Sequence, residues 1–202
     1  MTQYNYRYEE IFQESRSDKF GKGFRDRGQR KGQGLKCFHN YGAAYSLILG
    51  YLERLERPLS LLEIGVREGA SLETWKEVPS INEIVGIDVV LPEVSGTTLY
   101  QGSGYTPAML DTLRENHNGF DCIIDDGPHT WKTQKYFMEE YYSLLNPGGI
   151  MVCEDFVLHE HRAKLNRVKD RLGIYALDLR INSHAPHGKK RPGSSLLLRF
   201  KD

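Results

Sequence analysis

Hydrophobic positions along the chain fall into two alternating patterns. Short apolar runs lie at 59–65, 81–88, 97–102, 120–127, 149–155, 174–181 and 194–200. Runs of this length, bounded by turn residues, are typical of strands buried on both faces of a sheet. Stretches typical of helices lie between most of them, at 70–77, 107–116, 131–145 and 159–172. The alternation predicts an α/β fold, with a mostly parallel sheet that helices cover on both faces.

The region before the first run contains one more helix and one polar segment. Apolar and aromatic residues recur at helical spacing in 41–55, and Pro58 ends that helix. Upstream, Ser17–Lys36 is rich in glycine, lysine and arginine, which predicts a mobile loop, either a flap over a ligand or a solvated tether. We expect 1–38 to form an N-terminal segment with this basic lid or loop, and 39–202 to form a single domain.

Composition narrows the class of protein. Lys plus Arg and Asp plus Glu both number 27 in the 202 residues, so the net charge is zero and gives no case for a nucleic-acid or membrane partner. The first residues lack a signal-peptide pattern, and no stretch approaches the ~20 apolar residues of a membrane span. The three scattered cysteines, Cys37, Cys122 and Cys153, are typical of buried thiols rather than a disulfide framework. Together these features predict a cytoplasmic protein.

A glycine-containing turn follows the first predicted strand. The strand ends at Gly65 and a helix opens near Gly69, which gives G-x-x-x-G rather than the G-x-G-x-x-G of dinucleotide sites. Amides at a helix N-terminus favour an anionic group, and the carboxylate of Glu63 suits an ammonium group. Glu63, Gly65, Gly69 and Ser71 therefore fit the amino-acid end of S-adenosylmethionine; the alternative is a turn without a ligand.

Polar residues also end the second and third predicted strands. Asp88 lies 23 residues after Gly65, where a carboxylate can accept both ribose hydroxyls of a nucleoside. The alternative for Asp88 is a helix cap or a turn. Gln101 and Ser103 follow the third strand, where they could contact an adenine edge. The combination favours a nucleoside ligand, without separating S-adenosylmethionine from NAD.

Acidic residues gather at the ends of the fourth and fifth strands. Asp125 and Asp126 end the fourth, and Glu154 and Asp155 end the fifth. Carboxylates in one cleft repel each other unless a cation or protons offset them, and oxygen ligands of this kind suit Mg²⁺. We predict Asp126, Glu154 and Asp155 as metal ligands, with helix capping as the alternative for some. Asp125 could instead face the cofactor.

One histidine shares this acidic edge. His129 lies three residues after Asp126, where the next helix begins. Neutral imidazole titrates close to neutral pH, which suits a general base. We therefore predict His129 and Asp126 as the catalytic residues.

Taken in order, these motifs resemble one known group of enzymes. ExGxxxGxS, GID, DDGxH, NPGG and ED resemble the macrocin and mycinamicin sugar O-methyltransferases and the related cephalosporin-hydroxylase-like methyltransferases. Ser17-Asp18-Lys19 and His39-Asn40-Tyr41-x-x-x-Tyr45 resemble an upstream segment of that group, which adds Tyr41 to the cofactor-binding candidates. The resemblance runs from about Ser17 to Asp155. One departure is Pro128, where the group usually has serine.

The resemblance implies both a fold and a reaction. The fold is the Rossmann-like fold of class I methyltransferases, with a seven-stranded sheet and an antiparallel C-terminal strand. The reaction is Mg²⁺-dependent transfer of a methyl group from S-adenosylmethionine to a hydroxyl of a small molecule, a sugar or glycoside. In that group, the positions of Asp126, Glu154 and Asp155 hold the metal, and that of His129 is the base.

Other functions remain open from the sequence. A catechol-type or other small-molecule O-methyltransferase would share the metal chemistry and differ in its acceptor. A non-catalytic S-adenosylmethionine-binding domain would retain the fold without the reaction. An NAD(P)-dependent oxidoreductase is disfavoured by the absence of G-x-G-x-x-G and by the acidic cluster. The sequence leaves open the acceptor and whether the chain forms a homo-oligomer.

Overall fold

A single sheet of seven strands organises the chain. The structure is a computed structural model and describes residues 41–156, 158–178 and 195–202. The strands are β1 (Leu59–Ile64), β2 (Ile81–Asp88), β3 (Thr98–Gln101), β4 (Phe120–Asp125), β5 (Leu145–Phe156), β6 (Ile174–Asp178) and β7 (Ser195–Phe200). Their order is β3-β2-β1-β4-β5-β7-β6. The first five pair in parallel, and β7 is antiparallel to both neighbours, which confirms the predicted sheet.

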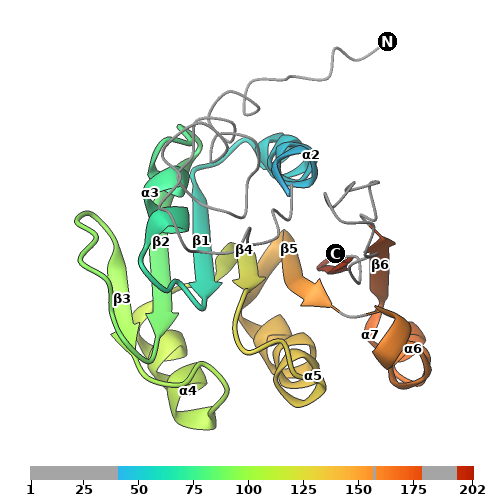
Figure 1. The fold of residues 1–202 in the computed structure, drawn as a ribbon. Coiled ribbons are helices and arrows are strands. Elements are labelled where there is room, and N and C mark those ends of the chain that lie inside the picture. The colour runs from blue at the N-terminus through green and yellow to red at the C-terminus, as the bar shows by residue number, and fades with distance from the viewer. Residues whose placement is uncertain (1–40, 157, 179–194) are drawn as a thin grey trace, which may run out of the picture.

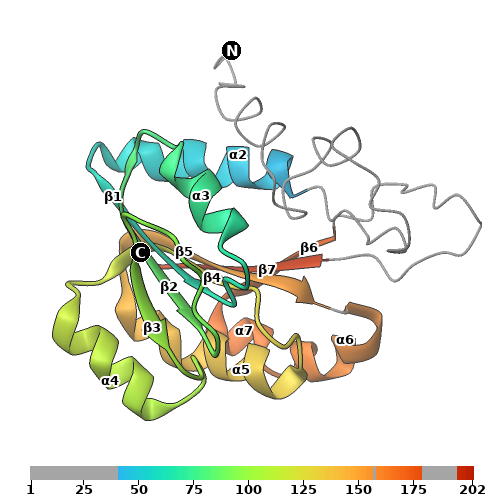
Figure 2. The same ribbon diagram turned by 60° about the vertical axis from the view of Figure 1, so that its left-hand side comes forward.

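Helices cover both faces of this sheet. They are α2 (Gly42–Leu52), α3 (Ala70–Lys76), α4 (Pro107–Asn116), α5 (Trp131–Glu140), α6 (Leu158–Asn166) and α7 (Lys169–Leu172), with 3₁₀ turns η3 (Glu53–Leu55) and η4 (Tyr141–Leu144). In Figure 2, α2 and α3 lie on one face, and α4, α5, α6 and α7 lie on the other. Figure 1 shows that the arrowheads of β1 to β5 point to one edge of the sheet. The carboxyl ends of the parallel strands therefore share that edge.

The core forms two layers because consecutive strand residues point to opposite faces. Ile124 and Val152 pack toward α2 and α3, whereas Ile123 and Met151 pack toward α4 and α5. All four side chains are fully buried. This two-sided burial explains why the strands read as continuous apolar runs rather than as alternating ones.

Side-chain hydrogen bonds cap the N-termini of α4 and α5. The Thr106 hydroxyl accepts from the Met109 amide before α4, and Pro107 occupies the first helical turn, where a missing amide costs nothing. The Thr130 hydroxyl accepts from the Thr133 amide before α5 in the same way. Both helices therefore begin at the carboxyl edge of the sheet, next to the polar strand ends.

The fifth strand begins earlier than the sequence predicted. The apolar run at 149–155 predicts a strand from Gly149, but β5 already begins at Leu145 and includes Asn146-Pro147-Gly148. The register between β4 and β5 shifts between Phe120 and Cys122, which lets the strand absorb the extra residues. The predicted helix over 159–172 is divided into α6 and α7.

Several sequence predictions lie outside the described residues. The basic segment Ser17–Lys36, together with Cys37 and His39, belongs to this part of the chain. The limits predicted for the N-terminal segment and the single domain are likewise not tested. Among the described helices, none is both long enough and apolar enough to cross a membrane.

Candidate functional site

Alternation along the strands divides the acidic residues of the carboxyl edge between the two faces of the sheet. Glu63 of β1 and Glu154 of β5 are buried and accept hydrogen bonds from side chains of α3 and α2, respectively. Asp125 of β4 is buried on the face that α4 and α5 cover, beside Cys153 of that core layer. Neighbouring residues of one strand cannot share a face while the backbone is extended. The buried carboxylates of Glu63 and Glu154 are therefore separated from that of Asp125 by the sheet.

Three residues come together where the strands end. One ligand atom each from Asp126, His129 and Asp155 lies within 4.8 Å of the others. His129 Nε2 lies 3.7 Å from Asp126 Oδ1 and 3.7 Å from Asp155 Oδ2. All three side chains are partly exposed, so a ligand can reach them. The structure thus joins the predicted catalytic pair with one of the predicted metal ligands.

The backbone of this group departs from extended geometry. His129 has φ +54° and Asp155 has φ +50°, in the left-handed region that few non-glycine residues adopt. Such conformations cost roughly 1–3 kcal/mol each and persist where surrounding contacts impose them. Because Asp155 leaves the extended conformation, it also leaves the alternation of β5. In this left-handed conformation, the side chain of Asp155 lies close to those of Asp126 and His129.

The donor set of the group fits a divalent cation. Two carboxylates and an imidazole offer hard oxygen and nitrogen atoms within reach of one ion. An ion there would also offset the repulsion between the carboxylates of Asp126 and Asp155. Mg²⁺ usually takes few protein ligands and keeps room for water or substrate, which suits the partial exposure of these side chains.

Glu154, the third predicted metal ligand, is not part of this group of three. Its side chain is 1% exposed, and its carboxylate accepts a hydrogen bond from the Tyr45 hydroxyl of α2. Burial next to that carboxylate raises the pKa of the Tyr45 hydroxyl well above its usual value. The structure therefore brings together Asp126 and Asp155, and holds Glu154 on the α2 face.

Asp125 has a different environment from Asp126. It accepts hydrogen bonds from the Tyr105 hydroxyl and, at 3.3 Å, from the Gly127 amide, and the Cys153 thiol lies 3.8 Å away. Burial raises the pKa of Asp125 to about 6, although the two hydrogen bonds favour its charged form. Of the two neighbouring aspartates, Asp126 is the one that joins the histidine group.

The glycine turn packs directly against the acidic edge. Gly65 has φ +89°, and a Cβ there would overlap the backbone carbonyl of Asp126. The Asp126 amide also donates to the Ile64 carbonyl at 2.9 Å. Gly69 has φ +79° and a Cβ there would overlap the side chain of Val94. Both glycines thus allow close approach of the chain to itself, and the turn after β1 is fixed next to Asp126.

Glu63 and Ser71, predicted to bind the cofactor, are both buried. Trp75 Nε1 donates to Glu63 Oε2 at 2.8 Å, so the indole of α3 orients this carboxylate. Ser71 lies in the first turn of α3, directly after the Gly69 cap. Both residues therefore flank the glycine turn.

The ends of β2 and β3 carry the predicted nucleoside contacts. Asp88 and Gln101 are partners in the parallel register of these strands. Asp88 Oδ2 accepts from the Arg67 amide at 2.7 Å, which closes the glycine turn and matches the turn role that the sequence left open. Gln101 Nε2 donates to the Val89 carbonyl at 3.2 Å, and Ser103 is exposed at the edge. The three residues line one stretch of the edge beside the glycine turn.

Two tyrosines in this region were not predicted as site residues. Tyr45 and Tyr105 bind the carboxylates of Glu154 and Asp125. The hydroxyl of Tyr41, a predicted cofactor contact, donates to Asp155 Oδ1 at 2.5 Å, and the predicted cofactor contact stays a prediction. The spacing of Tyr41 and Tyr45 is a signal that was available, because residues four apart share one face of a helix.

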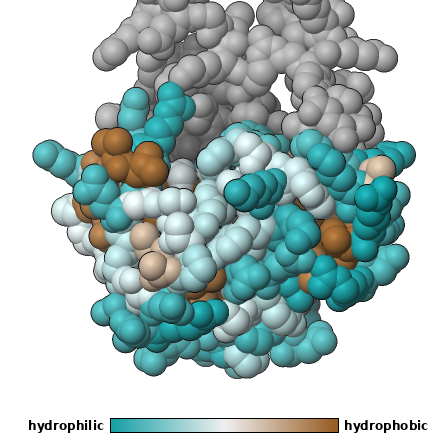
Figure 3. Space-filling model, turned by 90° about the horizontal axis from the view of Figure 1, so that it is seen from below, coloured by the Kyte–Doolittle hydropathy of each residue, from teal (hydrophilic) through white to brown (hydrophobic). Residues whose placement is uncertain are grey.

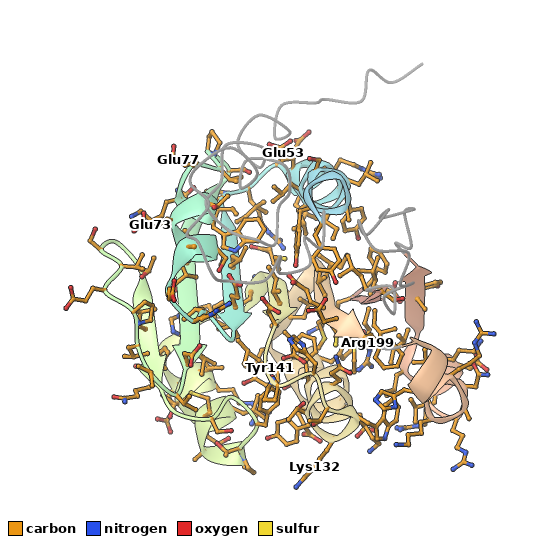
Figure 4. The ribbon with its side chains drawn as sticks, in the orientation of Figure 1. Glu53, Glu73, Glu77, Lys132, Tyr141 and Arg199 are labelled. Atoms are coloured by element: carbon orange, nitrogen blue, oxygen red, sulfur yellow. The ribbon has the colours of Figure 1, made fainter. Side chains whose placement is uncertain are left out.

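The loop that carries Ser103 and Tyr105 is anchored from below. The hydroxyl of Tyr141, labelled in Figure 4, donates to the Gly104 carbonyl at 2.5 Å. A Cβ on Gly104 would approach Ile64 of β1, so the loop is also packed against the end of that strand. These contacts fix the loop relative to the glycine turn.

Elsewhere the described surface offers little that suggests a binding site. Seen from below (Figure 3), it is mostly hydrophilic, with apolar residues in small separate areas. A cavity of about 490 Å³ opens at the amino edge of the sheet, far along the strands from the acidic group. Its charged side chains pair with one another, as Arg57 with Asp121 and His117 with Glu83, both at 2.7 Å. We assign this cavity no ligand.

Comparisons with curated proteins find sugar O-methyltransferases among the relatives of the chain. No family model matches the chain. An 8-demethyl-8-(2-methoxy-alpha-L-rhamnosyl)-tetracenomycin-C 3'-O-methyltransferase of Streptomyces olivaceus is 31% identical over 110 residues, which cover 49% of this chain and 28% of that protein. The 8-demethyl-8-alpha-L-rhamnosyl tetracenomycin-C 2'-O-methyltransferase of the same organism is 29% identical over 139 residues, 62% of this chain and 35% of that protein. The chain spans roughly a third of the length of these relatives.

Solved structures give the fold. The mycinamycin-pathway methyltransferase MycE, in complex with Mg and SAH, has a TM-score of 0.58 at 18% identity, covering 83% of this chain and 51% of that one. CalS11, a TDP-rhamnose 3'-O-methyltransferase, has a TM-score of 0.51 at 19% identity, covering 80% and 81%. The superpositions confirm the Rossmann-like fold of class I methyltransferases, and the curated relatives confirm the resemblance to sugar O-methyltransferases.

Proposed function

We propose that the chain transfers a methyl group from S-adenosylmethionine to a hydroxyl of a small-molecule acceptor, a sugar or glycoside. The observation that carries this proposal is the group formed by Asp126, His129 and Asp155 beside the glycine turn. In this proposal the histidine acts as the base, and the two carboxylates lie next to a turn suited to a methyl donor. The names of both curated relatives, which are rhamnoside O-methyltransferases, support the choice of acceptor class.

The methyl donor would lie along the ends of β1, β2 and β3. In this proposal Glu63, Gly65, Gly69 and Ser71 surround the amino-acid end of the donor, at the turn before α3. The residues at the ends of β2 and β3 that would serve the ribose and the base are Asp88, Gln101 and Ser103. Asp125, buried beneath the edge, would support the loop on which Tyr105 lies.

Asp126 and Asp155 would hold Mg²⁺, and Glu154 is kept as a proposed third ligand. The cation, when bound, lowers the pKa of a coordinated hydroxyl and orients it. Asp126 is fixed through its backbone, because its amide donates to Ile64 and its carbonyl packs on Gly65. MycE, which has the same fold, was solved with Mg and SAH, and this supports a metal in the proposal.

His129 would take the proton of the acceptor hydroxyl. Its Nε2 lies 3.7 Å from one oxygen of Asp126 and 3.7 Å from one of Asp155, so both carboxylates favour the positive charge that the ring gains. The left-handed backbone at His129 holds the ring over the acidic edge.

Two binding and activity measurements test the proposal. We expect calorimetry to detect S-adenosylhomocysteine and not NADH, because the glycine turn lacks the dinucleotide pattern. We expect methyl transfer from labelled S-adenosylmethionine to a rhamnoside acceptor with Mg²⁺, and its loss with EDTA. Transfer to catechol but not to glycosides would assign the alternative acceptor class. Binding without transfer to any acceptor would leave a non-catalytic binding domain, and NADH binding alone would overturn the proposal.

The proposal includes a cytoplasmic location. It is supported by Cys122 and Cys153, which are both buried and form no disulfide, a use of cysteine typical of a reducing compartment. Fractionation of cells that produce the full-length protein would test this location directly.

A further inference from the structure

Helix α2 presents two buried tyrosines to two consecutive residues at the end of β5. Tyr41 at the start of the helix contacts Asp155, and Tyr45 one turn later contacts Glu154. The exposed fractions of the two tyrosine side chains are 0% and 1%. These contacts join segments more than 100 residues apart in the sequence, so the position of α2 and that of the acidic edge are linked.

The Tyr41 hydroxyl binds Asp155 twice. It donates to Asp155 Oδ1 at 2.5 Å, and it accepts from the Asp155 backbone amide at 3.3 Å. One hydroxyl therefore restrains both the side chain and the backbone of a residue whose φ is +50°. The other carboxylate oxygen, Oδ2, is the one that lies 3.7 Å from His129 Nε2. The tyrosine contact thus determines which oxygen of Asp155 faces the group.

We propose that Tyr41 is a positioning residue, which holds Asp155 in the conformation that binds a divalent cation. This inference rests on the proposed function, because it needs a cation at Asp126 and Asp155. It assigns to Tyr41 a role toward the metal that the sequence did not suggest, beside its predicted cofactor contact. Partners that orient a metal ligand typically change metal affinity about 10- to 100-fold when they are removed.

Titration of the full-length protein with Mn²⁺, without methyl donor or acceptor, tests the inference. Free Mn²⁺ is followed by electron paramagnetic resonance, which reads cation affinity independently of turnover. We expect Tyr41→Phe to raise the Kd for Mn²⁺ about tenfold, because the ring stays and the donor is lost. Tyr51→Phe is the matched control, since Tyr51 lies on the same helix but packs its ring on Phe200, at 5.4 Å between centroids. We expect that control to leave the Kd unchanged.

A second measurement applies even where Tyr41→Phe does not fold. Tyrosine at position 41 is replaced by 3-fluorotyrosine, which keeps both the ring and the hydroxyl. We expect its ¹⁹F resonance to shift during Mg²⁺ titration with the same midpoint as calorimetry, and the same label at position 51 to stay unchanged. A purely structural role for Tyr41 would leave both resonances in place.

The outcomes separate this inference from the proposed function. If the unaltered protein binds no Mn²⁺, the proposed metal role fails, and the inference fails with it. If it binds Mn²⁺ and Tyr41→Phe binds equally well, the metal role stands and only the positioning role is overturned. An equal loss in Tyr51→Phe would also overturn it, because the effect would then belong to the helix and not to the contact.

Discussion

The indole nitrogen of Trp75, on α3, donates a hydrogen bond to the carboxylate of Glu63, on β1, at 2.8 Å. The bond lies on the face of the sheet that α2 and α3 cover. Both side chains have an exposed fraction of 0%. A buried carboxylate without a donor carries a large desolvation cost. This pair therefore couples the stability of the core to the acidic residue that we propose to face the methyl donor.

The first prediction concerns this pair. Trp75→Phe removes the donor and leaves a cavity, so we expect the free energy of unfolding to fall by about 2–4 kcal/mol. Urea denaturation measures the change. In a double-mutant cycle, the loss should be smaller when Glu63 is already glutamine, because no charge then depends on the indole. Equal losses in both backgrounds would assign the whole effect to packing.

The second prediction separates two roles for His129. If His129 is the base, the variant His129→Ala should have a kcat about 10²- to 10⁴-fold lower, with unchanged affinity for S-adenosylhomocysteine and Mn²⁺. The same nitrogen also lies within reach of a shared cation, so the metal titration decides between the roles. A parallel loss of Mn²⁺ affinity would make His129 a ligand, and surviving turnover would exclude it as the base.

The third prediction tests the carboxylates one at a time. We expect Asp126→Asn and Asp155→Asn each to weaken Mn²⁺ binding at least about tenfold, because each removes a proposed ligand charge. Glu154→Gln should do the same if Glu154 binds the cation. An unchanged Mn²⁺ affinity in Glu154→Gln would restrict the ligands to the group of Asp126, His129 and Asp155. Calorimetry with S-adenosylhomocysteine serves as the control for folding.

The fourth prediction concerns pH and Asp125, whose pKa is raised from 3.8 to about 6 by burial. The folded state then holds the proton more tightly than the unfolded state, so this carboxyl stabilises the fold less as pH rises from about 4 to about 6. Relative to Asp125→Asn, the unaltered protein should lose about 2 kcal/mol over that window and about 3 kcal/mol between about pH 3 and about pH 7, from the difference of roughly two pKa units. Urea denaturation of both proteins at several pH values measures this. Parallel pH profiles would contradict the raised pKa.

The fifth prediction uses two glycines with opposite surroundings. A Cβ on Gly65 would overlap the Asp126 carbonyl, whereas nothing lies within 4 Å of a Cβ on Gly50 in α2. Gly65→Ala should therefore destabilise the fold and weaken Mn²⁺ binding, since Asp126 must move. Gly50→Ala should stabilise the fold by about 0.5–1 kcal/mol, because alanine favours the helix. Thermal unfolding measures the stability of both variants, and Mn²⁺ titration measures their cation affinity. Unchanged stability and Mn²⁺ affinity in Gly65→Ala would contradict the close packing of Gly65 on Asp126.

The arrangement of the strands could be predicted from the sequence because every core strand is buried on both faces. The apolar runs at 59–65 and 120–127 correspond to β1 and β4. The shared edge of Asp88, Asp126 and Asp155 then follows from parallel pairing alone. Two-sided burial, however, does not indicate which face of the sheet a given strand residue points to.

The site was harder to predict because it depends on backbone that is not extended. Regular alternation would place Glu154 and Asp155 on opposite faces of the sheet, but both accept hydrogen bonds from tyrosines at the start of α2, and Asp155 leaves the extended conformation. The left-handed conformations of His129 and Asp155 have no sequence signature, since neither residue is glycine. The Tyr41 contact spans 114 positions, so no local pattern could have placed it.

The close fit between Gly65 and the main chain of Asp126 has a consequence for how such a protein can diversify. The separation between the glycine turn, where we propose that the donor binds, and the backbone of Asp126 is set by the adjoining strands β1 and β4. Under the proposed function, residues that face the acceptor could therefore be exchanged while the glycine turn keeps its place beside Asp126. New acceptors would come from altered loops above a reaction geometry that the backbone keeps constant.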